Sequence, residues 1–152
     1  MSRSSSCRSR RLALAGALLS TAVLPMAVAA PATAATREVH VQYLNQDGWG
    51  NTKYDIRFNG TVTSNGPTGY IIDGDLNGYC SSTLTGQSMT FGFGPSKQSW
   101  SWKSYWCTDE PHIHIKGTRA AGDTIDMQVG ATAGIANTYK YGDKQTFDIG
   151  ND

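Results

Sequence analysis

Residues 54–58 read YDIRF, in which three apolar side chains alternate with two charged ones. An alternation with a period of two places Tyr54, Ile56 and Phe58 on one face of an extended strand and the charged pair on the other. Such a strand buries its apolar face and leaves the charged face in water. The segment therefore predicts a two-faced β-strand at the border of an apolar core.

The same alternation recurs up to the C-terminal end, and no segment after residue 35 has the apolar spacing of an amphipathic helix. Clusters of Gly, Asn, Asp and Pro predict turns, for example at 65–67 and 73–75, and Asn59-Gly60 predicts a bulge. Residues 130–142, rich in Ala, Thr and Gly, predict a long connection. Further strands are expected around residues 39–43, 61–63, 70–72, 89–93, 100–106, 113–115, 125–129 and 147–149.

This spacing predicts an all-β fold of about eight or nine short strands. We expect a single small antiparallel β-sandwich over residues 36–152, with a small β-barrel as the alternative. No internal repeat suggests a second domain.

Residues 1–35 have the organisation of a cleaved signal peptide. Four arginines precede an uncharged, largely apolar run over residues 12–30, and Ala32-Thr33-Ala34 supplies the small residues that signal peptidase requires. A transmembrane anchor is less favoured, because Pro25 interrupts the apolar run just before the cleavage site. The sequence therefore predicts a secreted, extracellular protein without transmembrane anchoring.

Charge excludes two kinds of partner. The chain has 13 basic and 12 acidic side chains, and removing the four arginines of the leader leaves 9 basic against 12 acidic. A mildly acidic domain without a cluster of Lys and Arg lacks the electrostatic surface that attracts nucleic acid or an anionic membrane. We expect neither as a partner.

Two cysteines remain after removal of the leader, Cys80 and Cys107. In an oxidising compartment two thiols most simply form one disulfide. Closing a loop of this length stabilises the folded chain by about 3 kcal/mol in the chain-entropy treatment.

Residues 99–107 read SWSWKSYWC, and an extended strand places Trp100, Trp102 and Trp106 on one face. If that face is outside, the indoles form a platform on which sugar rings can stack, and Lys103 points inward. If it is inside, Lys103 is solvated and the tryptophans belong to the core. Because an unpaired buried ammonium is costly, the energetics favour the core arrangement.

The sequence offers two weak candidates for metal ligands. Residues 112–116 read HIHIK, and histidines at i and i+2 of a strand share a face from which they could bind Zn²⁺. Residues 73–78 read DGDLNG, which resembles the opening of an EF-hand calcium loop, but Leu84 stands where that loop needs a glutamate. Neither Ca²⁺ nor Zn²⁺ is favoured as a cofactor; the candidate ligands are His112, His114, Asp73, Asp75 and Asn77.

No motif of nucleophilic, metalloprotease or phosphate-binding chemistry is found, so no catalytic residue is assigned and an enzyme is not favoured. The preferred function is a secreted binding protein for a glycan or cell-wall polymer. The alternatives are a protein inhibitor of an extracellular hydrolase, which would use loops such as residues 94–99, and a small metal-dependent hydrolase. The predicted ligand contacts are Trp100, Trp102, Tyr105, Trp106 and Asp109.

Overall fold

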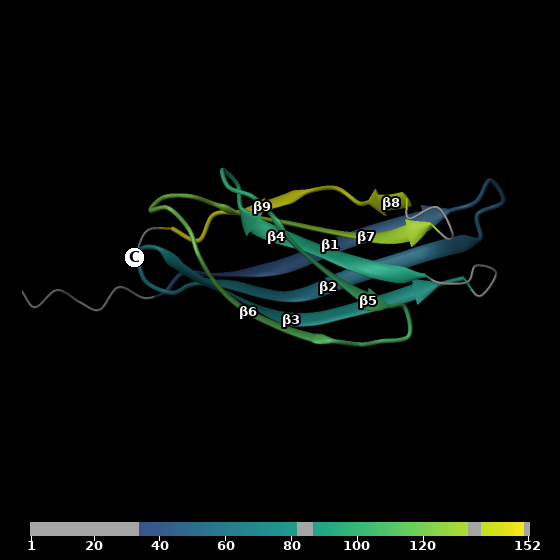
Figure 1. Cartoon of the computed structure of the whole chain (residues 1–152), viewed down its shortest axis with the longest axis horizontal. Coiled ribbons are helices and arrows are strands. Elements are labelled where there is room, and N and C mark those ends of the chain that lie inside the picture. The colour runs from purple at the N-terminus through teal and green to yellow at the C-terminus, as the bar shows by residue number, and fades with distance from the viewer. Residues whose placement is uncertain (1–33, 82–86, 134–137, 151–152) are drawn as a thin grey trace, which may run out of the picture. The chain divides into compact units, whose positions relative to one another are not determined.

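The computed structural model describes residues 34–81, 87–133 and 138–150, and the regular structure in these ranges is entirely β (Figure 1). The predicted leader lies outside the described residues except for its last two positions, so it stays a prediction. The strands are β1 (Thr36–Gln46), β2 (Thr52–Ser64), β3 (Gly69–Cys80), β4 (Ser88–Pro95), β5 (Ser101–Trp106), β6 (His112–Thr118), β7 (Ile125–Ala133), β8 (Thr138–Tyr141) and β9 (Gln145–Phe147).

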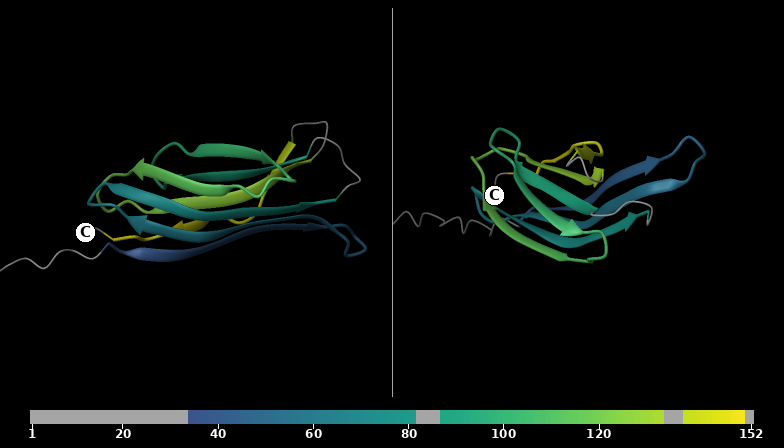
Figure 2. Two further views of the ribbon diagram at one scale, coloured as in Figure 1. Left: turned by 90° about the horizontal axis from the view of Figure 1, so that it is seen from below. Right: turned by 45° about the vertical axis from the view of Figure 1, so that its right-hand side comes forward.

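These strands form two antiparallel sheets, which confirms the predicted β-sandwich. Sheet 1 has the order β1-β2-β3-β6, and sheet 2 has the order β5-β4-β7-β8 with β9 also paired to β7. The two sheets lie as layers over each other, and the β1–β2 hairpin reaches beyond the strands of sheet 2 (Figure 2). The described part of the chain contains no apolar helix of the length that a membrane span needs.

The core lies between the sheets and consists of the alternating apolar residues that the sequence pattern indicates. The Phe58 ring of β2 stacks on the Phe91 ring of β4, with ring centroids 4.6 Å apart. The Tyr54 hydroxyl of β2 donates to the Thr132 carbonyl of β7 at 3.0 Å, which adds a buried hydrogen bond between the sheets. Fully buried side chains include Val39, Val41, Ile56, Phe58, Ile72, Leu76, Met89, Phe91, Ile113, Ile125, Met127, Val129 and Ile149.

The glycines of the two middle strands of sheet 1 do not form the predicted bulge and turn. β2 runs without a register shift through Gly60, and Gly74, expected in a turn at 73–75, pairs with Gly60 from the middle of β3. A Cβ on Gly60 would lie 2.7 Å from the Gly74 Cα, and a Cβ on Gly74 would lie 2.9 Å from the Phe58 ring. These glycines therefore allow two backbones and an aromatic ring to approach closely, which is a reason other than turn formation for glycine in a strand.

The predicted connection and the predicted disulfide have different outcomes. The predicted connection at 130–142 is wrong in part, because β7 continues to Ala133 and residues 138–141 form β8; residues 134–137 lie outside the described residues. The predicted disulfide between Cys80 and Cys107 is confirmed, with a Cα–Cα distance of 5.9 Å. It joins the end of β3 in sheet 1 to the turn after β5 in sheet 2.

Candidate functional site: the aromatic face of sheet 2

The tryptophans of β5 lie at the surface, so the favoured core arrangement is wrong. Trp102 and Trp106 are 45% and 62% exposed, and Trp100, just before the strand, is half buried. The energetic objection to this arrangement fails because β5 is the edge strand of sheet 2, where the inward-pointing Lys103 is also exposed to solvent. Of the residues on the inner side of β5, Tyr105 packs against the core.

Small residues form the floor of the same outer face. β4 pairs with β5 and β7, and its residues Ser88, Thr90 and Gly92 alternate with core residues, so they point away from the core. Across the β4–β7 pairing, Gly130 lies opposite Thr90. These small side chains leave room for large rings from the flanking strands.

The flanking strands fill this room with aromatic rings. Trp102 of β5 lies against Gly92, since a Cβ there would come within 2.4 Å of the indole. On the same face, but from the opposite flanking strand, Tyr141 of β8 lies against Gly130, where a Cβ would come within 2.5 Å of the ring. The two rings meet over the floor, with their centroids 4.8 Å apart.

Two more rings extend this contact into a continuous row. The Trp100 and Trp102 centroids are 5.6 Å apart, and Tyr139 and Tyr141 are nearly parallel at 6.2 Å. Partial burial, with a smaller effect of Tyr139, raises the pKa of the Tyr141 hydroxyl, which therefore stays neutral at ordinary pH. We call these four residues, Trp100, Trp102, Tyr141 and Tyr139, the aromatic row.

A cavity of about 420 Å³ adjoins the aromatic row at its Tyr139 end. Trp106 and Tyr139 contribute to its wall from β5 and β8, the two strands that flank β4 and β7. Its floor includes Ser88 and Thr132, whose hydroxyls lie 3.2 Å apart. The described residues that line the cavity are Ser88, Ser104, Tyr105, Trp106, Asp109, Thr132 and Tyr139.

The turn after β5 fixes Trp106 and Asp109 of this cavity relative to each other. The Asp109 amide donates to the Trp106 carbonyl, and the Trp106 amide donates to Asp109 Oδ2, both at 3.0 Å. Cys107 lies inside this turn and is tied by its disulfide to Cys80. The cavity therefore has a wall that is held in place before any ligand arrives.

Four of the five predicted ligand contacts lie on this face or in the turn beside it, whereas Tyr105 lies on the inner side of β5 and lines the cavity from there. Trp100 and Trp102 belong to the aromatic row, whereas Tyr105, Trp106 and Asp109 line the cavity. The sequence does not indicate Tyr139 and Tyr141, because its composition predicts a connection over residues 130–142. The alternation of these tyrosines with Lys140 was the available signal for a strand.

The two sets of candidate metal ligands come together on the outer face of sheet 1. β3 pairs with β6 so that Asp73 lies opposite His114 and Asp75 opposite His112. His114 Nδ1 lies 2.5 Å from Asp73 Oδ2, and His112 Nδ1 lies 2.8 Å from Asp75 Oδ1. The calcium-loop interpretation fails because residues 73–78, Asn77 included, are extended within β3.

These histidines and aspartates interact with one another instead. Within the described ranges, no group of three or more His, Cys, Asp or Glu side chains is arranged to hold a metal ion. The hydrogen bond from His114 is the main cause that lowers the pKa of Asp73. The hydrogen bond to Asp75 is the main cause that raises the pKa of His112, with Asp73 adding to it.

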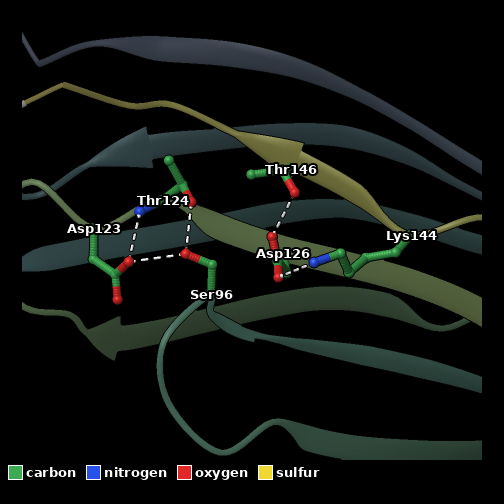
Figure 3. Close-up of polar contacts among 6 residues, drawn as sticks. All are labelled: Ser96, Asp123, Thr124, Asp126, Lys144 and Thr146. Carbon is green, nitrogen blue, oxygen red and sulfur yellow. Dashed lines mark hydrogen bonds and ion pairs between the residues drawn. The ribbon is translucent and has the colours of Figure 1, made fainter.

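Two buried carboxylates, Asp123 and Asp126, lie at or just before the start of β7, whereas Thr132 of the cavity lies near the end of that strand. Figure 3 shows their side-chain contacts. Asp126 of β7 accepts from Lys144 Nζ at 2.9 Å and from the Thr146 hydroxyl at 2.6 Å. Asp123 accepts from the Ser96 hydroxyl at 2.8 Å. These contacts join the β4–β5 and β6–β7 connections and β9, so both carboxylates act in holding this end of the sheet together.

No protein family, curated protein or solved structure matches this chain. Its function is therefore inferred from the arrangement of its own side chains. The inhibitor and the metal-dependent hydrolase named as alternatives stay untested predictions.

Proposed function

We propose that this chain is a non-enzymatic binding protein that holds a glycan on the aromatic face of sheet 2. The observation that carries the proposal is the continuous row of four rings, from Trp100 to Tyr139, beside a cavity with hydroxyl and carboxylate groups. Sugar rings present flat C–H faces and a rim of hydroxyls. Indole and phenol rings supply matching flat apolar surfaces, and the polar cavity groups supply hydrogen bonds.

The site is also rigid, which helps it to bind a ligand through several weak contacts. Trp102 and Tyr141 rest on strand backbone, and the turn that carries Trp106 is closed by hydrogen bonds and a disulfide. A preorganised surface loses little conformational entropy when a ligand binds. This favours recognition of a polymer through several modest stacking contacts.

The proposal includes an extracellular location for the folded domain. Cys80 and Cys107 form a disulfide, and such bonds persist in oxidising compartments. The predicted leader at residues 1–35 supports the same location. Detection of the cleaved chain, beginning near residue 35 or 36, in culture medium would test this part.

The ligand-binding part is tested by pull-down on insoluble polysaccharides. Trp102→Ala and Trp106→Ala should each weaken retention by about tenfold, as expected when an aromatic anchor is removed from a binding surface. Trp49→Ala is the matched control, because Trp49 is 92% exposed at the tip of the β1–β2 hairpin, outside the aromatic face. Equal retention of all three variants and the parent chain would contradict the proposal.

A further inference from the structure

The described lining of the cavity beside the aromatic row carries negative charge and no positive charge. Among the described residues that line it, Asp109 is the only charged one. A carboxylate there repels ligands with uronate, sulfate or phosphate groups, and no Lys or Arg in the described part of the lining offsets this repulsion. The lining is therefore suited to a neutral or positively charged ligand group.

The carboxylate is held in place but keeps acceptor capacity. Asp109 Oδ2 receives the Trp106 amide, and within the described part of the chain no hydrogen bond to Oδ1 is found. A carboxylate oxygen can accept more than one hydrogen bond. Hydrogen bonds between a carboxylate and an ammonium are roughly twice as strong as bonds between neutral groups.

The aromatic residues of the cavity favour the same kind of group. Trp106 and Tyr139 line it from opposite sides, and both are exposed. Aromatic faces attract cations through their quadrupole, and tryptophan does so most strongly. An ammonium in this cavity would therefore combine one charge-assisted hydrogen bond with attraction to the aromatic wall.

We infer that the cavity formed by Trp106, Asp109 and Tyr139 selects a sugar unit that carries a free, protonated amine, such as an unacetylated hexosamine. It prefers this unit to the N-acetylated sugar and to the sugar with a hydroxyl in place of the amine. This inference rests on the proposed function, because the aromatic row must hold the rest of the glycan. It adds the chemical class of the ligand. N-acetylation removes the positive charge, so acetylation of the glycan would control binding.

The test is calorimetric titration with three β-1,4-linked oligosaccharides of equal length, made of glucosamine, N-acetylglucosamine or glucose. At pH 5 and low salt the parent chain should bind the glucosamine oligomer about tenfold more tightly than the other two. Asp109→Asn, which keeps an oxygen to accept from the Trp106 amide, should remove this preference. Asp143→Asn, which deletes an exposed charge outside the cavity, should keep it.

A second measurement uses the unmodified protein, so its result does not depend on correct folding of the Asp109→Asn variant. Raising the salt concentration screens charges, so the preference of the parent chain for the glucosamine oligomer should shrink while binding of the neutral oligomers persists. Equal binding of all three oligomers, or an unchanged preference in Asp109→Asn, would overturn the inference and leave the proposed function standing. Binding of none of the three oligomers would overturn the inference, and undiminished binding of these oligomers by Trp102→Ala would overturn the proposed function as well.

Discussion

At the scale of single residues, Gly92 and Gly130 show how the chain brings aromatic rings onto a sheet. Both lie on the outer face of sheet 2, and each has a ring where a side chain would otherwise be. They differ in what else a new Cβ would meet. At Gly92 the nearest atoms belong to the Trp102 side chain, whereas at Gly130 the nearest is the Lys140 carbonyl oxygen at 2.3 Å.

We therefore expect Gly92→Ala to move the Trp102 indole off the sheet, because a side chain at an exposed edge can swing into solvent. Ligand retention should fall, and the free energy of unfolding should change by less than about 1 kcal/mol. Gly130→Ala must displace the backbone of β8 and should cost about 2 kcal/mol. Denaturant unfolding and polysaccharide pull-down of the two variants measure both effects; equal losses of stability would contradict this explanation.

Asp126 and Lys144 allow a second residue-scale prediction. The Asp126 side chain is almost fully buried, whereas half of the Lys144 side chain is exposed. Lys144→Met leaves a buried carboxylate with Thr146 as its remaining side-chain partner and should cost about 2 kcal/mol, since an uncompensated buried charge is strongly unfavourable. Adding Asp126→Asn should restore part of this loss in urea unfolding. A double variant less stable than the single one would contradict the prediction.

At the scale of elements, the pairing of β3 with β6 depends on pH through its outer face. Asp73 and Asp75 of β3 face His112 and His114 of β6, and Lys116 follows on the same face. Because the pKa of His112 is raised in the folded chain, its contribution to stability is complete below about pH 6.5 and is lost as pH rises through the raised value. Because the pKa of Asp73 is lowered, its contribution is present above about pH 3.8 and is lost as pH falls through the lowered value.

The pairing is therefore strongest between these two limits, in mildly acidic solution. Asp75→Asn should lower the pKa of His112 more than Asp73→Asn does, because the hydrogen bond to Asp75 is the largest cause of the shift. An NMR titration of the imidazole protons measures this order directly. The reverse order would show that Asp73 is the dominant partner of His112, which contradicts the prediction, and no shift in either variant would show that neither carboxylate controls His112.

At the scale of the whole folded domain, the disulfide links its stability to its candidate site. Cys80 lies at the end of β3 in sheet 1, and Cys107 lies in the turn that places Trp106 and Asp109. Replacing both cysteines by serine should lower the free energy of unfolding by about 3 kcal/mol. It should also weaken ligand binding at temperatures where the chain is still folded, because the turn loses its tie to sheet 1. Unchanged binding by the folded double variant would show that the hydrogen bonds of the turn are sufficient.

Much of the fold follows from local patterns. Tyr54, Ile56 and Phe58 are buried as their alternation indicates, and the same holds for Met89, Phe91 and Phe93. A strand with a period of two has the same two faces wherever it lies, so the sequence alone determines that these segments are strands and which residues share a face. The pairing of Cys80 with Cys107 was similarly constrained, because only two cysteines remain after the predicted leader.

The site depended on relations that no local pattern contains. Whether the tryptophan face of β5 is buried depends on whether a second sheet covers it, and the structure places β5 at an edge with that face in water. The approach of Tyr141 to Trp102 requires β4 and β7 to lie between their strands with glycines on the outer face. The sequence thus determined most of the strands and which residues share a face, but not β8 or the continuation of β3 through Gly74. Only the tertiary structure decided which sides meet solvent and which rings meet each other, since burial and strand order are set by contacts between residues far apart in the chain.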